Sequence, residues 1–266
     1  MQAEICEKCG KPLELLSLGF GEKKSCILKK CSCILDTEIQ QDNLQKKTDK
    51  ENEVERIYNS SSMKNYRHMQ FSNYKVISSK HENLLKIAKK YTGAFNMLRK
   101  KGKGITIVGE KGNGKTHIAA AISNFLIQQQ SRNVVFENVP YLMSKIRSLY
   151  TQGYNSSSGE RATEIDIINR LCDSDLLVLD DIGACAWSGK DEERLYIIID
   201  QCITRHTPII ATTNLKNDDE MTKCLGDRAY SRLAAANVAI TNTCPSYRDN
   251  QVRNNMSFNG DWEKIL

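Results

Sequence analysis

The chain has 266 residues, a hydrophobic fraction of 40% and a formal net charge of +6. This length suits one sizeable core with a small appendage. No apolar stretch approaches the ~20 residues that a membrane span needs, and the first residues lack the basic start and apolar core of a secretory signal. We therefore expect a protein of a reducing cytoplasm, without a membrane partner, in which the ten cysteines do not form disulfides.

Cysteine is concentrated near the N-terminus, where five of the ten cysteines lie within the first 33 residues. Cys6 and Cys9 form a C-x2-C knuckle, and Cys31 and Cys33 form a second cluster further along the chain. Four thiolates satisfy a closed tetrahedral Zn²⁺ site. The segment has too few apolar residues for a core of its own, so the metal would supply its folding energy. Residues 1–40 are therefore predicted to be a zinc-binding module with these four cysteines as ligands.

This ligand set has alternatives. Cys26 could replace Cys31 or Cys33, and an iron–sulfur cluster would also accept four cysteines. Free cysteines in a disordered tail are the third alternative. The five later cysteines are scattered singly, which favours burial as small hydrophobic side chains.

The next segment, residues 41–65, is polar and charged with a weak helical pattern, which is typical of a partly helical linker. The main domain is expected over residues 66–266. Between Asn83 and Gly109 there are seven Lys or Arg residues and no Asp or Glu. This stretch is compatible with a polyanionic partner, and a solvated face explains it equally well.

Residues 109–116 fit the phosphate-binding loop G-x-x-x-x-G-K-[ST]. The apolar run Ile105–Val108 precedes the loop as a strand would, and apolar residues at helical spacing follow it. Glycines let backbone N–H groups close around phosphate oxygens at the positive end of the new helix. A lysine then reaches the β- and γ-phosphates, and a threonine hydroxyl is available to Mg²⁺. The predicted ATP-binding residues of the loop are Gly109, Gly112, Asn113, Gly114, Lys115 and Thr116.

Four more strand patterns follow, and helical patterns separate most of them. This alternation predicts an α/β fold with a mostly parallel sheet, in which ligands lie at the carboxyl ends of the strands. The predicted strands are Val134–Glu137, Leu176–Leu179, Ile209–Thr213 and Val238–Thr241.

Two of these strands run into polar residues suited to phosphate chemistry. Asp180 and Asp181 follow the second of the four, and we expect Asp180 to hold Mg²⁺ and Asp181 to polarise the attacking water. A carboxylate pair in this position could otherwise be a cap or turn. Asn214 follows the third strand and could bond the γ-phosphate or the water, although an isolated Asn there is more often a turn residue.

Together with the loop, four motifs occur in a fixed order: residues 176–183, residues 211–214, residues 225–233 and residues 246–248. Over residues 63–250 the set resembles the AAA+ ATPases of the DnaC/DnaI helicase-loader type and their relatives, the IstB transposition helpers. The resemblance implies a P-loop AAA+ domain with a five-stranded parallel sheet, in a bacterial host or its phage. The cysteine-rich module is similar to those of DnaI-like and phage loaders and is not usual for IstB.

The resemblance also implies arginine roles. Arg232 matches the arginine finger that acts on ATP of a neighbouring subunit, with Arg228 as the alternative, and Arg248 matches the second sensor. Without the resemblance all three are solvated charges. Many AAA+ proteins have Asp-Glu where this chain has Asp180-Asp181, and the shorter side chain leads us to expect slow hydrolysis. The 18 residues after Arg248 are too few for a full helical lid.

The resemblance to helicase loaders also implies contacts with single-stranded DNA, which we expect on the helix after Pro140, where Tyr150 aligns with a DNA-contacting position of the family, and on the loop after the aspartate pair. In that helix Tyr141, Leu142, Ile146 and Leu149 form an apolar stripe. The candidate DNA contacts are Lys145, Arg147, Tyr150 and Trp187. Core packing explains Tyr150 equally well on the helical pattern, and loop anchoring explains Trp187.

Three functions follow from these motifs. The first is a loader with ATP, Mg²⁺ and Zn²⁺, which binds a hexameric DnaB-type helicase through its N-terminal module and forms a ring or open spiral on single-stranded DNA. The second is an IstB-like ATPase that binds duplex DNA and a transposase. The third is an adaptor in which ATP is only structural.

Overall fold

The computed structural model describes residues 5–6, 9–11, 15–18, 25–28, 31–151, 163–184 and 188–247. The chain divides into two compact units, Met1–Glu53 and Val54–Leu266. In the first unit β1 (Leu15–Leu18) pairs antiparallel with β2 (Ser25–Leu28). The helix α1 (Ser32–Ser60) follows and takes in most of the segment predicted as a linker. No helix of the described ranges is long and apolar enough to cross a membrane.

The second unit is built on a five-stranded sheet in the order β4-β5-β6-β3-β7, in which every pairing is parallel. The α/β class and the five-stranded parallel sheet predicted from the sequence are confirmed. Four of the strands are longer than their patterns, and β5 extends furthest, because it continues through both aspartates. The strands are β3 (Gly104–Gly109), β4 (Val134–Asn138), β5 (Leu176–Ile182), β6 (Ile209–Thr213) and β7 (Asn237–Asn242).

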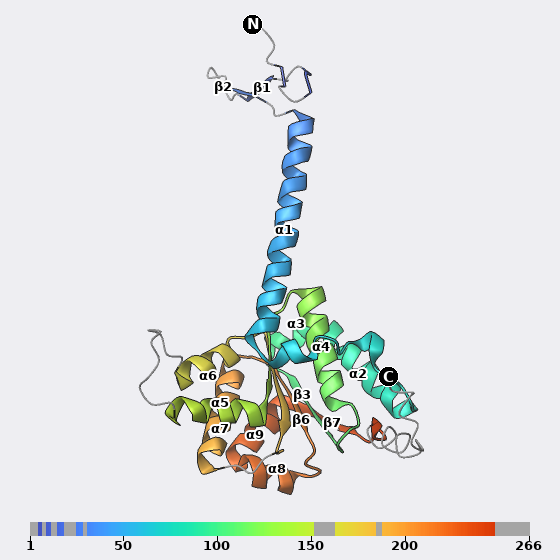
Figure 1. Ribbon diagram of the computed structural model, residues 1–266, viewed down its shortest axis with the longest axis vertical. Coiled ribbons are helices and arrows are strands. Elements are labelled where there is room, and N and C mark those ends of the chain that lie inside the picture. The colour runs from blue at the N-terminus through green and yellow to red at the C-terminus, as the bar shows by residue number, and fades with distance from the viewer. Residues whose placement is uncertain are drawn as a thin grey trace, which may run out of the picture. The chain divides into compact units, whose positions relative to one another are not determined.

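Helices cover both faces of this sheet (Figure 1). Successive strand residues pack against opposite layers. Leu176 and Val178 contact one layer, whereas Leu177 and Leu179 contact the other. The first layer contains α2 (Ser79–Gly93), α3 (Phe95–Lys100) and α4 (Lys115–Gln130). The second contains α5 (Val139–Thr151), α6 (Glu164–Cys172), α7 (Gly189–Thr204), α8 (Asp218–Leu225) and α9 (Asp227–Ala236).

The apolar stripe of α5 differs from the one predicted. Leu142 and Ile146 are fully buried and Leu149 is partly buried, but Tyr141 is 62% exposed. The buried position beside Leu142 is taken by Met143 instead. Each residue turns the helix by about 100°, so a core contact centred on Leu142, Met143 and Ile146 turns Tyr141 to the surface.

A short irregular segment precedes the sheet in the chain, and the buried side-chain amide of Asn124 holds it in place. The segment contains the 3₁₀ turns η1 (Ser62–Tyr66) and η2 (Phe71–Asn73). Asn124 of α4 donates to the carbonyls of Tyr66 at 3.0 Å and Met69 at 2.6 Å, and its Oδ1 accepts from the hydroxyl of Tyr58 at 2.5 Å. Asn124 is 1% exposed, so these groups depend on each other rather than on water.

We predict that Asn124→Ala lowers the free energy of unfolding by about 2–3 kcal/mol, because it removes three buried hydrogen bonds, two to the carbonyls of Tyr66 and Met69 and one from the hydroxyl of Tyr58. Gln129→Ala is the matched control, since Gln129 lies exposed on the same helix; its effect should stay within about 0.5 kcal/mol. Chemical denaturation followed by circular dichroism measures both. Equal effects of the two changes would contradict the structural role of Asn124.

Candidate nucleotide-binding site

The backbone of the loop between β3 and α4 packs closely against neighbouring segments of the protein. Gly114 has a φ of 86°, and a Cβ there would lie 3.1 Å from a ring carbon of Tyr74. A Cβ at Gly109 would lie 2.4 Å from the carbonyl oxygen of Asn242. Both positions therefore require glycine. Gly114 requires it because of its positive φ, and at both positions a side chain would crowd its neighbours.

The amine of Lys115 donates hydrogen bonds to several acceptors of the loop. It donates to the carbonyls of Gly109 at 2.9 Å and Glu110 at 2.7 Å, and to Oδ1 of Asn113 at 3.3 Å. It also donates to Oδ1 of Asn214 at 2.8 Å. The structure thus joins the loop lysine to the polar tip of β6, two features that the sequence identified separately.

Asn113 is held by a partner that the sequence analysis missed. Its Nδ2 donates to the carbonyl of Asn242 on β7, and Nδ2 of Asn242 donates to the carbonyl of Asn113, each at 3.0 Å. The two residues are 1% and 4% exposed. This reciprocal pair ties the phosphate loop to the edge strand of the sheet, so the amide of Asn113 serves the loop rather than the cleft.

Asp180 lies at the base of the site and is 2% exposed. Its Oδ1 accepts from the hydroxyl of Thr116 at 3.0 Å and from the hydroxyl of Thr212 at 2.7 Å. Burial raises the pKa of Asp180 above its ordinary value, the bond from Thr212 opposes that rise, and the neighbouring carboxylate of Asp181 adds to it. A carboxylate beside a hydroxyl at a helix N-terminus offers hard oxygen donors, and this donor set fits Mg²⁺.

The direction of the Asp181 side chain is set by an unusual backbone conformation. Its φ is 62°, which is uncommon for a residue with a side chain, and the pairing of β5 with β6 shifts register between Leu179 and Ile182. The amide of Asp181 donates to the hydroxyl of Thr212 at 2.9 Å, and Nδ2 of Asn214 donates to its carboxylate at 3.4 Å. The irregularity therefore lies at one of the residues proposed for catalysis.

These groups line a cleft of about 350 Å³. The backbone N–H of Tyr247 donates to the carbonyl of Gly112 at 2.9 Å, which brings a late segment of the chain over the loop. The ring of Tyr247 lies 4.8 Å from that of His81, whose pKa is lowered by burial. The lining consists of Met69, Lys111, Gly112, Asn113, Gly114, Lys115, Thr116, His117, Asp181, Ala184, Asn214 and Tyr247. Met69 and His117 carried no motif in the sequence.

The predicted arginines are separated from this cleft. Arg228 and Arg232 are both exposed residues of α9, and neither belongs to the described lining. A guanidinium nitrogen of Arg232 lies 3.2 Å from Oδ1 of Asp200 on α7. Arg248 lies outside the described residues.

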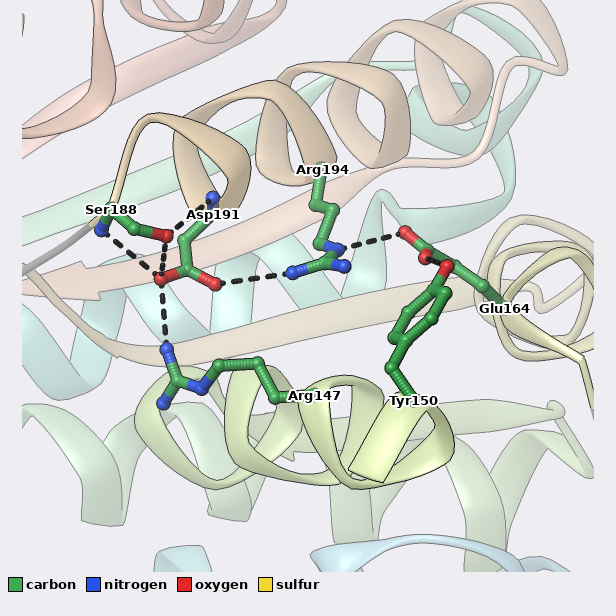
Figure 2. A network of polar contacts seen from close by, with 6 residues as sticks. All are labelled: Arg147, Tyr150, Glu164, Ser188, Asp191 and Arg194. Atoms are coloured by element: carbon green, nitrogen blue, oxygen red, sulfur yellow. Dashed lines mark hydrogen bonds and ion pairs between the residues drawn. The ribbon is translucent and has the colours of Figure 1, made fainter. Parts of the chain in front are cut away.

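The candidate DNA-binding residues of α5 lie on its exposed face. Lys145 is exposed, and Arg147 is bound to Asp191 of α7 at 2.8 Å. Tyr150 is 66% exposed, so it is not a core residue, and its hydroxyl donates to Glu164 of α6 (Figure 2). Trp187 lies outside the described residues.

Three of the predicted zinc ligands lie together in the N-terminal unit. The sulfur atoms of Cys6, Cys9 and Cys31 are all within 4.8 Å of one another. The amide of Gly10 donates to the carbonyl of Cys6 at 2.8 Å, with Gly10 at a φ of 70°, which forms the tight turn of the knuckle. Three clustered thiols fit a thiolate zinc site. Cys33 belongs to α1, but its side chain, like that of Cys26 on β2, is outside the described part.

A phosphate loop between a strand and a helix, beside an aspartate pair on an inner strand of a parallel sheet, defines a P-loop domain of the AAA+ type. The chain belongs to the family of IstB-like ATP binding proteins, whose model matches residues 30–248. It is 30% identical to the replicative helicase loader DnaC of Escherichia coli K12 over 187 residues, which are 69% of this chain and 71% of DnaC.

Solved structures show the same fold. The crystal structure of the DnaC helicase loader aligns with a TM-score of 0.57 at 23% identity, covering 67% of this chain and 98% of that one. The crystal structure of DnaI aligns with a TM-score of 0.52 at 18% identity, covering 68% and 92%.

We predict that Asp180→Asn stabilises the nucleotide-free protein. Because the folded-state pKa of Asp180 is raised, its ionised form disfavours folding above that pKa, and the penalty is relieved as the pH falls through it. The variant should therefore melt higher than the wild type at pH 7.5, with a difference that shrinks toward acidic pH. Scanning calorimetry across this range measures the effect.

The control for this prediction is Asp219→Asn, which removes an exposed carboxylate from the first turn of α8. An acidic residue there favours the helix dipole, so its removal should lower the melting temperature slightly. A lower melting temperature for Asp180→Asn at pH 7.5 would show that hydrogen bonding outweighs burial at Asp180.

Proposed function

We propose that this protein loads a replicative DNA helicase of the DnaB type onto single-stranded DNA, as an ATP-dependent AAA+ oligomer. The observation that carries the proposal is the 30% identity to DnaC over 69% of the chain. It is supported by a cleft in which Lys115, Thr116 and both aspartates converge.

ATP is hydrolysed to ADP and phosphate in this proposal. The amides of the loop and Lys115 bind the phosphates, after the lysine amine exchanges its carbonyl partners for phosphate oxygens. Thr116 and Asp180 hold Mg²⁺, which when bound neutralises charge on those oxygens. Asp181 accepts a proton from the attacking water, and Asn214 orients that water. We expect slow turnover, because Asp181 is one methylene shorter than glutamate. We also expect DNA or the helicase to stimulate this turnover.

The oligomer completes the site in this scheme. Arg232 is proposed to act on the γ-phosphate of a neighbouring subunit, where its guanidinium stabilises developing charge. It is 54% exposed, and the ion pair with Asp200 restrains it at the surface of α9. Arg228, one helical turn earlier, is the alternative finger, and Arg248 is proposed as the sensor that contacts ATP in its own subunit.

Partner binding is assigned to two other regions. The N-terminal unit, with Zn²⁺ on Cys6, Cys9, Cys31 and a fourth ligand proposed as Cys33, is proposed to bind the helicase. Lys145, Arg147, Tyr150 and Trp187 are proposed to contact single-stranded DNA.

A transposition helper of the IstB type is the second candidate, and the description of the matching family favours it. The two differ in their nucleic acid and protein partner. ATP-dependent filaments on duplex DNA, without retention of a replicative helicase, would favour the helper.

We predict that Cys9→Ser abolishes binding of Zn²⁺ and retention on an immobilised replicative helicase while nucleotide binding is kept. Elemental analysis should give about one zinc per wild-type chain, as expected for a closed four-thiolate site, and none for the variant. Cys224→Ser, a half-buried cysteine of α8, is the matched control and should keep both properties. If no candidate helicase retains the wild-type protein, the loader proposal fails.

We predict that Lys115→Ala and Arg232→Ala are each nearly inactive in ATP hydrolysis but regain activity when mixed. Lys115→Ala should lose nucleotide binding, whereas Arg232→Ala should keep it. In an equimolar mixture about one interface in four pairs an intact loop with an intact finger, if subunits assemble at random around a head-to-tail ring. Turnover should recover to roughly that fraction.

Arg205→Ala serves as control for the mixing experiment, because Arg205 pairs with Asp173 at 2.6 Å on the surface and has no proposed role. It should hydrolyse ATP like the wild type. A mixture that co-sediments but stays inactive would refute the action of Arg232 in trans and direct attention to Arg228.

A further inference from the structure

Five polar residues and one aromatic residue form a connected network between α5, α6 and the start of α7 (Figure 2). Arg147 is bound to Asp191 at 2.8 Å, and Arg194 approaches the same carboxylate at 3.5 Å. Arg194 also donates through Nε to Glu164 at 3.0 Å, and Tyr150 donates to Glu164 as well. Two arginines and a tyrosine hydroxyl are therefore directed at two carboxylates.

The two carboxylates of this network have different structural duties. Asp191 is 2% exposed and accepts from the amide and the hydroxyl of Ser188, which forms the capping box of α7. Burial raises the pKa of Asp191, but the bonds from Ser188 and the charges of Arg147 and Arg194 together outweigh burial, and the pKa is lowered overall. The fold therefore requires Asp191.

Glu164 contributes less to the fold, through the favourable position of an acidic residue in the first turn of α6. The capping box of α6 is formed by Thr163 and Asp166, so Glu164 is not needed to begin the helix. Its carboxylate is 18% exposed, and the bonds recorded for it within the described ranges come from Arg194 and Tyr150. Glu164 thus mainly occupies the donors of two other side chains.

Those donors face an open cavity of about 630 Å³. The guanidinium of Arg194 lies over the ring of Tyr150 at 5.3 Å, and that ring is 66% exposed. Lys190 adds an exposed positive charge to the lining, and Glu193 adds an exposed negative one. An exposed aromatic ring backed by a guanidinium, with further cations beside it, is suited to stacking a base and binding its phosphate.

We propose that Arg194 is a phosphate-binding residue of the single-stranded DNA site and that Glu164 takes the place of the phosphate until DNA displaces it. The carboxylate of Glu164 accepts from two donors, the Nε of Arg194 and the hydroxyl of Tyr150. Phosphate oxygens can accept from the same two donors. This proposal rests on the DNA binding proposed above. It adds Arg194 to the contacts and gives the site a built-in competitor that restricts weak or transient binding.

The charge of Glu164 gives the proposal a distinctive signature. Glu164→Gln keeps the size and one acceptor oxygen but removes the competing charge, so DNA should bind tighter rather than weaker. The dissociation constant should fall by about two- to fivefold, as expected for a partly exposed ion pair.

The test uses the full chain, loaded with zinc and ATP analogue, and fluorescence anisotropy of labelled oligo(dT) over a series of salt concentrations. The variants are Glu164→Gln, Arg194→Gln and the double variant. Arg194→Gln should weaken binding, and Glu164→Gln should bring no gain once Arg194 is absent, because the two changes act on one contact. If Arg194→Gln lowers the melting temperature, Arg194→Lys replaces it, since lysine keeps the charge without the guanidinium fork.

Asp173→Asn is the matched control, because Asp173 ends the same helix and is ion-paired with the exposed Arg205. It removes an equal charge and should leave binding unchanged. The proposal is overturned if Glu164→Gln binds no tighter than the wild type, or if its gain persists without Arg194 or appears equally in Asp173→Asn. Absence of binding by the wild type at every salt concentration would instead refute DNA binding itself, and the proposal with it.

Discussion

The burial of one carboxylate, that of Asp180, is the constraint on which the rest of the site depends. The interior disfavours its charge, so hydroxyls from two neighbouring elements must donate to it: Thr116 from α4 and Thr212 from β6. Thr212 also accepts the amide of Asp181 and so fixes the peptide that turns this second aspartate toward the cleft. Asn214 then links Asp181 to the amine of Lys115. A single chain of hydrogen bonds therefore connects the groups that we propose for metal binding, for polarising the water and for phosphate binding.

Much of this arrangement could be predicted from the sequence, because the strands of a parallel sheet are buried on both faces and appear as continuous apolar runs. The four strands β3 to β6 were found in this way, and β6 matched its predicted limits, whereas β7 was also predicted although this edge strand is largely exposed. The phosphate loop was equally clear, since its glycines and lysine are fixed by local geometry. Parallel topology then brought Asp180 and Asn214 to the same edge of the sheet, as expected.

What the sequence could not supply were contacts between distant segments. The bonds between Asn113 and Asn242 join residues 129 positions apart, and neither residue signals its partner. The positive φ of Asp181 arises from a register shift that no pattern encodes. Tyr141 was placed in the core of α5 because its side chain is apolar in large part, whereas the packing of α5 selects a neighbouring face. In each case tertiary packing decided among options that local sequence leaves open.

Tyr247 closes one side of the cleft. Its amide donates to the carbonyl of Gly112, and its hydroxyl donates to the carbonyl of Lys75, 172 positions away. The order of synthesis therefore determines when the cleft can be completed. During synthesis the strands and helices of the sheet emerge in order and fold as units, but this wall of the cleft cannot form until residue 247 has left the ribosome. Nucleotide binding through the complete cleft is thus withheld from nascent chains.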